Sequence, residues 1–169
     1  MDFNKLIRNI PDFPKKGIIF KDITTILSNG ESYNNLMHTI KDRYKNRTIN
    51  KVVGIEARGF ILGAALAVLL NCAFTPIRKK GKLPFNTYYE TYDLEYGQDT
   101  LEIHKDAFDK NDNVILIDDV LATGGTINAS IKLLRNFEIN IIETFFLIEI
   151  LKLKGKQKID CKYFSLIKA

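Results

Sequence analysis

The chain has 169 residues, of which 46% are apolar and 27% are charged. This balance is typical of a globular protein and excludes a disordered, collagen-like or membrane-embedded chain. The length predicts one domain over residues 1–169, since domains average roughly 150 residues. The net charge of +5 comes from residues 151–169, which hold six lysines against one aspartate. A neutral body with a short basic tail favours a solvated surface over a nucleic-acid partner.

The two cysteines, Cys72 and Cys161, form no CxxC pair, and only His38 and His104 could join them as zinc ligands. We therefore expect neither a structural metal site nor a disulfide framework. The first residues lack a continuous apolar stretch, and the apolar run at 60–70 is too short to span a bilayer. The sequence thus predicts a cytoplasmic protein without a membrane segment.

Apolar runs and helical patterns alternate along the middle of the chain. In chain order we expect a strand at 51–55, a helix at 59–71, strands at 73–77 and 114–117, a helix at 126–136 and a strand region at 139–150. Strands that are apolar throughout, alternating with helices, predict an α/β fold with a parallel sheet covered on both faces.

Three segments do not fit this alternation. Residues 83–104 are rich in tyrosine, threonine and acidic residues, which predicts an inserted β-hairpin or a long loop with strand character. The terminal segments 1–30 and 151–169 are short and mixed. We expect them to pack over the sheet as a small hood.

The densest chemistry lies in residues 114–126, VILIDDVLATGGT, where a buried strand leads into two carboxylates and a glycine-rich turn. Ligands of open α/β sheets bind at this end of a strand. Gly124 and Gly125 would let the backbone approach a phosphate, which the N–H groups of the next helix attract. Asp118 and Asp119 suit sugar hydroxyls or Mg²⁺. These residues favour a sugar phosphate, with an ordinary strand end and helix cap as the alternative.

Two basic segments could face the same ligand. Arg58, in EARGF, follows the first strand, and its planar guanidinium can donate two hydrogen bonds to phosphate oxygens. Residues 78–82, RKKGK, place four cations in five residues after the second strand. A surface arginine and a solvated charge run are the alternatives for these two segments.

The string VILIDDVLATGGT resembles the phosphoribosyl-pyrophosphate binding motif of the type I phosphoribosyltransferase family. Within that family, similarity to the adenine phosphoribosyltransferases covers nearly the full chain, through DFPKKGIIFKDI, GIEARGF, IRKKGKLP and LEYGQDTLEIHKDAF. The resemblance implies a type I phosphoribosyltransferase-like parallel sheet flanked by helices. It also implies the reaction of adenine with phosphoribosyl pyrophosphate to AMP and pyrophosphate (purine salvage), Mg²⁺ as cofactor, and a homodimer.

The resemblance further implies roles for individual residues in binding phosphoribosyl pyrophosphate. The loop that would hold the 5′-phosphate comprises Ala122, Thr123, Gly124, Gly125 and Thr126. Asp118 and Asp119 would engage the ribose hydroxyls with their Mg²⁺. The residues implied to bind pyrophosphate are Arg58, Arg78, Lys79 and Lys82, with Arg78 reaching into the neighbouring subunit's site.

For the purine, the resemblance implies that Phe20 packs on the adenine ring while the backbone of Ile19 and Lys21 hydrogen-bonds its edge. Glu95 would be the catalytic carboxylate near the purine nitrogens, and Tyr96 would close over the reaction centre. Two alternatives stay open: a ligand sensor that has lost catalysis, and an enzyme that uses hypoxanthine or xanthine.

Overall fold

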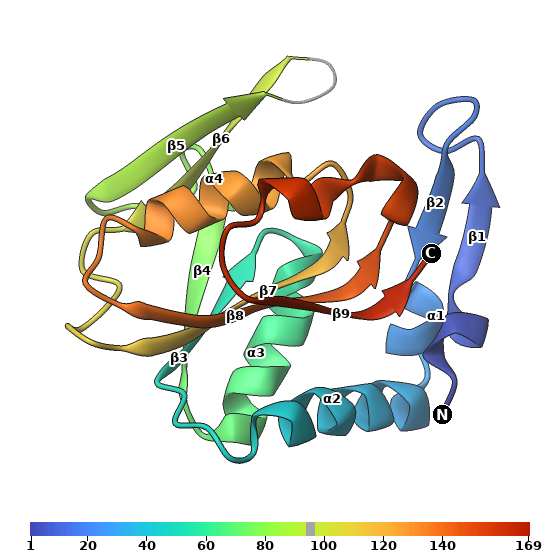
Figure 1. Ribbon diagram of the computed structural model, residues 1–169, viewed down its shortest axis with the longest axis horizontal. Coiled ribbons are helices and arrows are strands. Elements are labelled where there is room, and N and C mark those ends of the chain that lie inside the picture. Colours follow the sequence, from blue (N-terminus) through green and yellow to red (C-terminus); the bar gives the residue numbers. More distant parts are fainter. Residues whose placement is uncertain (94–96) are drawn as a thin grey trace. The chain divides into compact units, whose positions relative to one another are not determined.

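The computed structural model describes residues 1–93 and 97–169, and it divides into two compact units, residues 1–45 and 46–169. The larger unit contains strands β3 (Lys51–Ile55), β4 (Ala73–Lys79), β5 (Thr87–Asp93), β6 (Gln98–His104), β7 (Asn113–Leu121), β8 (Asn140–Glu149) and β9 (Tyr163–Lys168). They form one sheet in the order β5-β6-β4-β3-β7-β8-β9 (Figure 1). That both units belong to one domain stays a prediction.

The sheet is parallel from β4 to β9 and antiparallel at its other edge. Strands β4, β3, β7, β8 and β9 pair in parallel, whereas β6 pairs antiparallel with β4 and β5 pairs antiparallel with β6. The predicted parallel sheet and the predicted hairpin are thus both confirmed. The hairpin extends the main sheet through Arg78↔Glu102 and Lys79↔Leu101.

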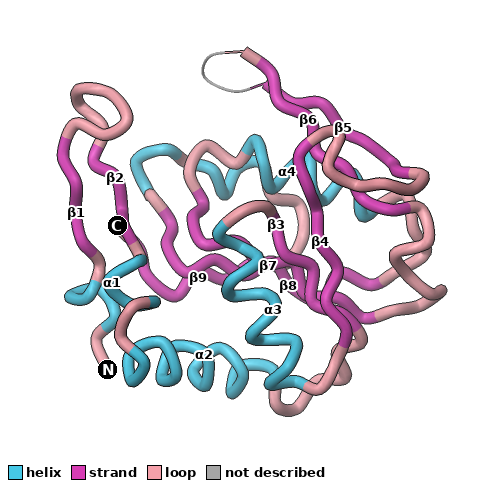
Figure 2. The backbone as a smooth tube through the Cα atoms, turned by 180° about the vertical axis from the view of Figure 1, so that it is seen from behind, coloured by secondary structure: helices cyan, strands magenta, loops and turns pink. Residues whose placement is uncertain are grey.

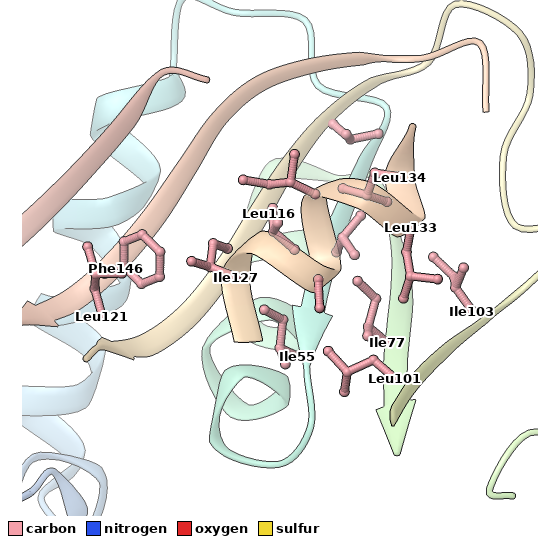
Figure 3. Packing of buried hydrophobic residues seen from close by; sticks show 14 residues of the cluster. Ile55, Ile77, Leu101, Ile103, Leu116, Leu121, Ile127, Leu133, Leu134 and Phe146 are labelled. Carbon is pink, nitrogen blue, oxygen red and sulfur yellow. The ribbon is translucent and has the colours of Figure 1, made fainter. Parts of the chain in front are cut away.

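Helices α3 (Arg58–Leu70) and α4 (Gly125–Leu134) cover opposite faces of this sheet (Figures 1 and 2). Side chains alternate between the two faces along a strand. Leu116 of β7 therefore joins the buried cluster that includes Ile127 of α4, while the next residue, Ile117, lies against Gly63 of α3. Figure 3 shows the α4 side of this core, to which β3, β4, β6, β7 and β8 all contribute.

Two strands run further than the sequence predicted. Strand β7 continues to Leu121, so Asp118 and Asp119 lie in a strand and not in a loop. The reason is the length of β8, which still pairs with β7 at Asp118↔Phe146 and Val120↔Ile148. Strand β4 likewise continues to Lys79, because β6 provides a partner for its last residues.

The C-terminal segment differs from the predicted hood. Its last residues form β9, a parallel edge strand beside β8, while residues before it form two short 3-10 turns, η2 (Leu151–Leu153) and η3 (Gly155–Lys158). Alternate side chains of β9, Ser165 and Ile167, are buried, which is the pattern of a strand with one covered face.

The smaller unit contains η1 (Phe3–Leu6), β1 (Arg8–Pro11), β2 (Ile19–Asp22), α1 (Thr24–Leu27) and α2 (Gly30–Tyr44). Strands β1 and β2 form a two-stranded antiparallel sheet. Asp22 stabilises its end, since its carboxylate accepts hydrogen bonds from the Thr24 N–H at 2.9 Å and from Nη2 of Arg8 at 2.6 Å. These bonds lower the pKa of Asp22 to about 2. In the parts of the chain described, no helix combines the length and the apolar character needed to cross a membrane.

Candidate active site

The loops after β3 and the end of β7 meet at the carboxyl edge of the parallel strands. Arg58, the first residue of α3, places its Nε 2.8 Å from Oδ2 of Asp119. Gly59 permits this approach, because a side-chain carbon there would come within 2.9 Å of the Ile117 carbonyl oxygen and 3.0 Å of Oδ1 of Asp118. The prediction that Arg58 and the acidic pair share one edge is therefore confirmed.

Asp118 and Asp119 form a coupled pair of carboxylates, with Asp119 buried and Asp118 partly exposed. Asp119 is 4% exposed, and the Asp119 N–H donates to Oδ1 of Asp118 at 2.9 Å. Burial, followed by the neighbouring charge of Asp119, raises the pKa of Asp118 well above its usual range. Burial also raises the pKa of Asp119, against the opposing effect of the Arg58 guanidinium. Two such carboxylates are poised to accept hydroxyl donors or a cation.

One oxygen of this pair lacks a hydrogen-bond donor. Oδ2 of Asp119 is inaccessible to solvent and accepts no hydrogen bond within the described structure, although it forms the ion pair with Arg58. Arg58 therefore compensates the charge of this oxygen, and the carboxylates of this pair are the kind of group that binds ribose hydroxyls or a hydrated Mg²⁺. Across residues 1–93 and 97–169, no group of three or more His, Cys, Asp or Glu side chains could hold a metal alone. The donor set fits a Mg²⁺ held mainly by substrate oxygens.

The predicted phosphate loop surrounds a pocket lined by Asp118 and residues 120–127. Helix α4 begins at its rim with Gly124 as N-cap. No side chain caps this helix, and its first turn carries no acidic residue. The N-terminal N–H groups of α4 therefore have neither a side-chain acceptor nor an acidic neighbour, which suits them to bind a phosphate.

The two glycines of the loop also make room for other backbone segments of the chain. Gly124 has φ +80°, which favours glycine, and a side chain there would collide with the backbone of Gly155, including its carbonyl carbon at 3.1 Å. A side-chain carbon at Gly125 would lie 3.3 Å from the Asp93 carbonyl oxygen. Both glycines thus allow other backbone segments to approach, and close approach of a phosphate is not the only reason for them.

Glu56 organises the basic segment, a role that sequence reasoning missed. It forms an ion pair with Lys82, lies 3.4 Å from Nε of Arg78, and accepts a hydrogen bond from the Lys79 N–H at 3.0 Å. Burial would raise the pKa of Glu56, but the bonds from Lys82 and Lys79 and the nearby cations together lower it. The sequence did offer one indication of this role, since Glu56 lies only two residues before Arg58.

The hairpin reaches the phosphate loop through a chain of polar side chains. Nζ of Lys79 lies 3.0 Å from Oδ2 of Asp99, the Tyr92 hydroxyl donates to the same oxygen at 3.5 Å, and Thr126 donates to the Tyr92 hydroxyl at 3.4 Å. The bond to Asp99 raises the pKa of Lys79. These contacts link the cation cluster to the first turn of α4.

The residues predicted to act on the purine lie in the smaller unit or outside the described residues. Ile19, Phe20 and Lys21 lie in β2 of the smaller unit, where Phe20 packs edge-to-face on Phe13 at 5.2 Å. Ile19 and Lys21 are two residues apart, so their backbone groups point to the same edge of β2. Glu95 and Tyr96 lie outside the described residues. Arg78 is held by Glu56 of its own chain.

Known proteins resemble this chain over almost its whole length. Residues 22–168 match the family model described as the phosphoribosyl transferase domain. A protein of Citrifermentans bemidjiense named adenine phosphoribosyltransferase is 52% identical over 168 residues, which is 99% of this chain and 98% of the relative.

Solved structures agree with this relationship. The adenine phosphoribosyltransferase of Thermoanaerobacter pseudethanolicus is 46% identical, with a TM-score of 0.94 over 98% of this chain and 97% of that one. The Giardia lamblia enzyme, solved with 9-deazaadenine, is 43% identical, with a TM-score of 0.93 over 99% and 96%. The chain belongs to the adenine phosphoribosyltransferases, within the type I phosphoribosyltransferase family.

Proposed function

We propose that this chain joins adenine to phosphoribosyl pyrophosphate, forming AMP and pyrophosphate, with the carboxyl edge of its larger sheet as the binding site for the activated sugar. The observation that carries this proposal is the convergence on that edge of three features. They are the Asp118–Asp119 pair, of which Asp119 is buried, the uncapped start of α4, and the cations gathered by Glu56. Phosphoribosyl pyrophosphate needs all three: acceptors for its ribose hydroxyls, N–H donors for its 5′-phosphate, and cations for its pyrophosphate.

The 5′-phosphate binds in the pocket lined by residues 120–127. Backbone N–H groups at the start of α4 donate to its oxygens, and the hydroxyls of Thr123 and Thr126 add side-chain donors. Asp118 and Asp119 accept hydrogen bonds from the ribose hydroxyls. The Arg58 guanidinium, already paired with Asp119, keeps that carboxylate in position.

Pyrophosphate leaves from a ribose carbon that becomes positively charged in the transition state. Arg58, Arg78, Lys79 and Lys82 stabilise the negative charge that develops on the departing pyrophosphate. Before the substrate arrives, Arg78 and Lys82 are held by Glu56 and Lys79 by Asp99. Their charges are therefore assembled in advance, which lowers the reorganisation needed during the reaction.

Mg²⁺ fits this site as an ion carried by the substrate. Asp118 and Asp119 would hold it through the ribose hydroxyls. When bound, the ion neutralises charge on the pyrophosphate oxygens.

The adenine is assigned to β2. Phe20 offers an aromatic face, and the backbone of Ile19 and Lys21 offers N–H and C=O groups that can read a purine edge. Glu95 is assigned to proton movement on the base, with Tyr96 closing over the reaction centre. The 9-deazaadenine bound to the Giardia lamblia relative supports a purine of the adenine type.

A cytoplasmic homodimer is the expected form of the protein, with Arg78 reaching the neighbouring site. Analytical ultracentrifugation of the wild type tests whether the protein is a dimer. Mixing two inactive variants to restore activity tests whether the two subunits share a site.

Turnover of adenine, hypoxanthine, guanine and xanthine with phosphoribosyl pyrophosphate and Mg²⁺ tests the function directly. Of these four bases, only adenine should react with phosphoribosyl pyrophosphate and release pyrophosphate. Turnover of hypoxanthine or xanthine in its place would establish a different purine. Binding of phosphoribosyl pyrophosphate without turnover of any base would establish a ligand sensor.

A further inference from the structure

The phosphate loop rests on a second backbone segment that the assigned function leaves without a role. Gly124 and Gly155 are in direct backbone contact: a side-chain carbon at Gly155 would collide with the Ala122 carbonyl oxygen and lie 2.9 Å from the Gly124 nitrogen. Gly155 is buried although it lies within the lysine-rich tail. Figure 1 draws this 3-10 segment, in red, beside the start of α4.

The backbone holds Gly155 firmly in this place. The Ile150 N–H donates to the Leu121 carbonyl at 2.9 Å, which fixes the entry of the segment at the end of β7. Lys154 then adopts a left-handed conformation with φ +54°, and its N–H donates to Leu151 at 3.1 Å. This turn directs Gly155 at the loop while the Lys154 side chain stays exposed.

We propose that Gly155 is a positioning residue for the 5′-phosphate of the substrate. This proposal rests on the assignment of residues 122–126 as the phosphate cradle. Ala122 and Gly124 both line the pocket, and both would have to move if Gly155 carried a side chain. Gly155 therefore sets where the loop and the first N–H groups of α4 point, without contacting the phosphate itself.

The proposal predicts a selective loss. A displacement of about 1 Å at a binding group can lower catalytic efficiency about 100-fold. Gly155→Ala should therefore raise the KM for phosphoribosyl pyrophosphate by between about 10- and 100-fold. The KM for adenine and the affinity for pyrophosphate should stay near wild type, since neither ligand uses the phosphate loop.

Calorimetry with AMP and with pyrophosphate separates this role from a general structural one. In Gly155→Ala, AMP, which carries the 5′-phosphate, should bind more weakly while pyrophosphate binds normally. Equal weakening of both ligands, or of neither, would overturn the proposal. Gly30→Ala is the matched control, because Gly30 has open space around it and no positive φ.

A second pair of variants decides the matter if Gly155→Ala does not fold. Lys154→Val and Lys154→Gly both remove the exposed lysine side chain, but only valine strains the left-handed backbone that directs Gly155. Lys154→Val should weaken AMP binding, and Lys154→Gly should bind AMP as the wild type does. Identical AMP affinities in the two variants would overturn the proposal. Failure of the proposed function would show instead as an inactive wild type.

Discussion

The carboxylate of Glu56 forms an ion pair with Lys82 and lies 3.4 Å from Nε of Arg78. Glu56 directly follows β3, and it thus gathers Arg78, near the end of β4, and Lys82, just beyond β4, which pairs with β3 in parallel. Like charges held this close repel each other, so the cluster needs this counter-charge while no pyrophosphate is bound. Glu56 acts on the ligand through these cations.

Glu56→Gln should weaken pyrophosphate binding about 5- to 10-fold, in the range typical for loss of a partner in a polar network. Glutamine can still accept from the Lys79 N–H, but it loses the ion pairs that keep Lys82 and Arg78 in position. Calorimetry on Glu56→Gln, Lys82→Met and the double variant measures the coupling. The double variant should lose less than the two single losses combined, because only the contact of Glu56 with Arg78 then remains to be removed. Tighter binding by Glu56→Gln would mean that the carboxylate competes with pyrophosphate.

Asp118→Asn should stabilise the ligand-free protein at neutral pH while weakening phosphoribosyl pyrophosphate binding. Because the folded-state pKa of Asp118 is raised, the native protein binds more protons than the unfolded chain above the ordinary value of 3.8. The stability contributed by Asp118 is therefore complete at low pH and is lost as the pH rises through its folded pKa. The melting temperature of the variant should exceed that of the wild type at pH 7, and this gap should close towards pH 3.

Asp160→Asn is the control, because the pKa of Asp160 is lowered whereas that of Asp118 is raised. The Arg135 guanidinium, 2.5 Å away, lowers the pKa of this exposed aspartate. Its small contribution to stability is present at neutral pH and lost in acid, so the variant should never melt above the wild type. A stabilised Asp160→Asn together with an unchanged Asp118→Asn would contradict the raised pKa of Asp118.

Tyr92→Phe should raise the KM for phosphoribosyl pyrophosphate slightly and lower the free energy of unfolding by about 1 kcal/mol, the usual net value of one hydrogen bond. The variant keeps the aromatic ring, which lies next to Gly125. It loses only the hydroxyl that lies between Thr126 and Asp99. Urea unfolding and steady-state kinetics measure the two effects. A loss of turnover instead would indicate that this hydroxyl takes part in the reaction.

Local patterns predicted the strands and helices because their apolar faces are continuous in sequence. The strand at 51–55 agrees with β3 residue for residue, since buried residues end there abruptly. The end of β7 could not be read in the same way. Asp118 and Asp119 look like loop residues, and only the partner strand β8, more than 20 residues later, keeps them in the sheet.

Some residues of the candidate site could likewise be predicted from the sequence, and others could not. Motif similarity predicted Arg58 and the phosphate loop, each of which lies within one short segment. It missed Glu56, Asp99 and Gly155, which act through residues distant in sequence. Gly155 offered one weak signal, a single glycine in a run of lysines. Nothing in its neighbours indicates that its backbone must fit against Gly124.

Glu95→Gln tests the residue to which the reaction chemistry is assigned. Glutamine keeps the size and hydrogen-bonding reach of Glu95 but cannot exchange a proton with adenine. Assistance to proton transfer is typically worth about 10²- to 10⁴-fold. The variant should therefore lose kcat by about that factor, while the KM values for adenine and phosphoribosyl pyrophosphate change little.

The control for Glu95 has to be an acid of the same hairpin with no part in the cation cluster. Glu102 is unsuitable because its carboxylate accepts a hydrogen bond from the Gly81 N–H at 2.9 Å, inside the loop that carries Lys82. Glu90 is better suited, since it pairs with Lys132 of α4 at 2.9 Å. Glu90→Gln should lose less than about 1 kcal/mol of stability and keep its kcat. If Glu90→Gln lost as much kcat as Glu95→Gln, the effect would belong to the charge of the hairpin, and Glu95 would have no catalytic role.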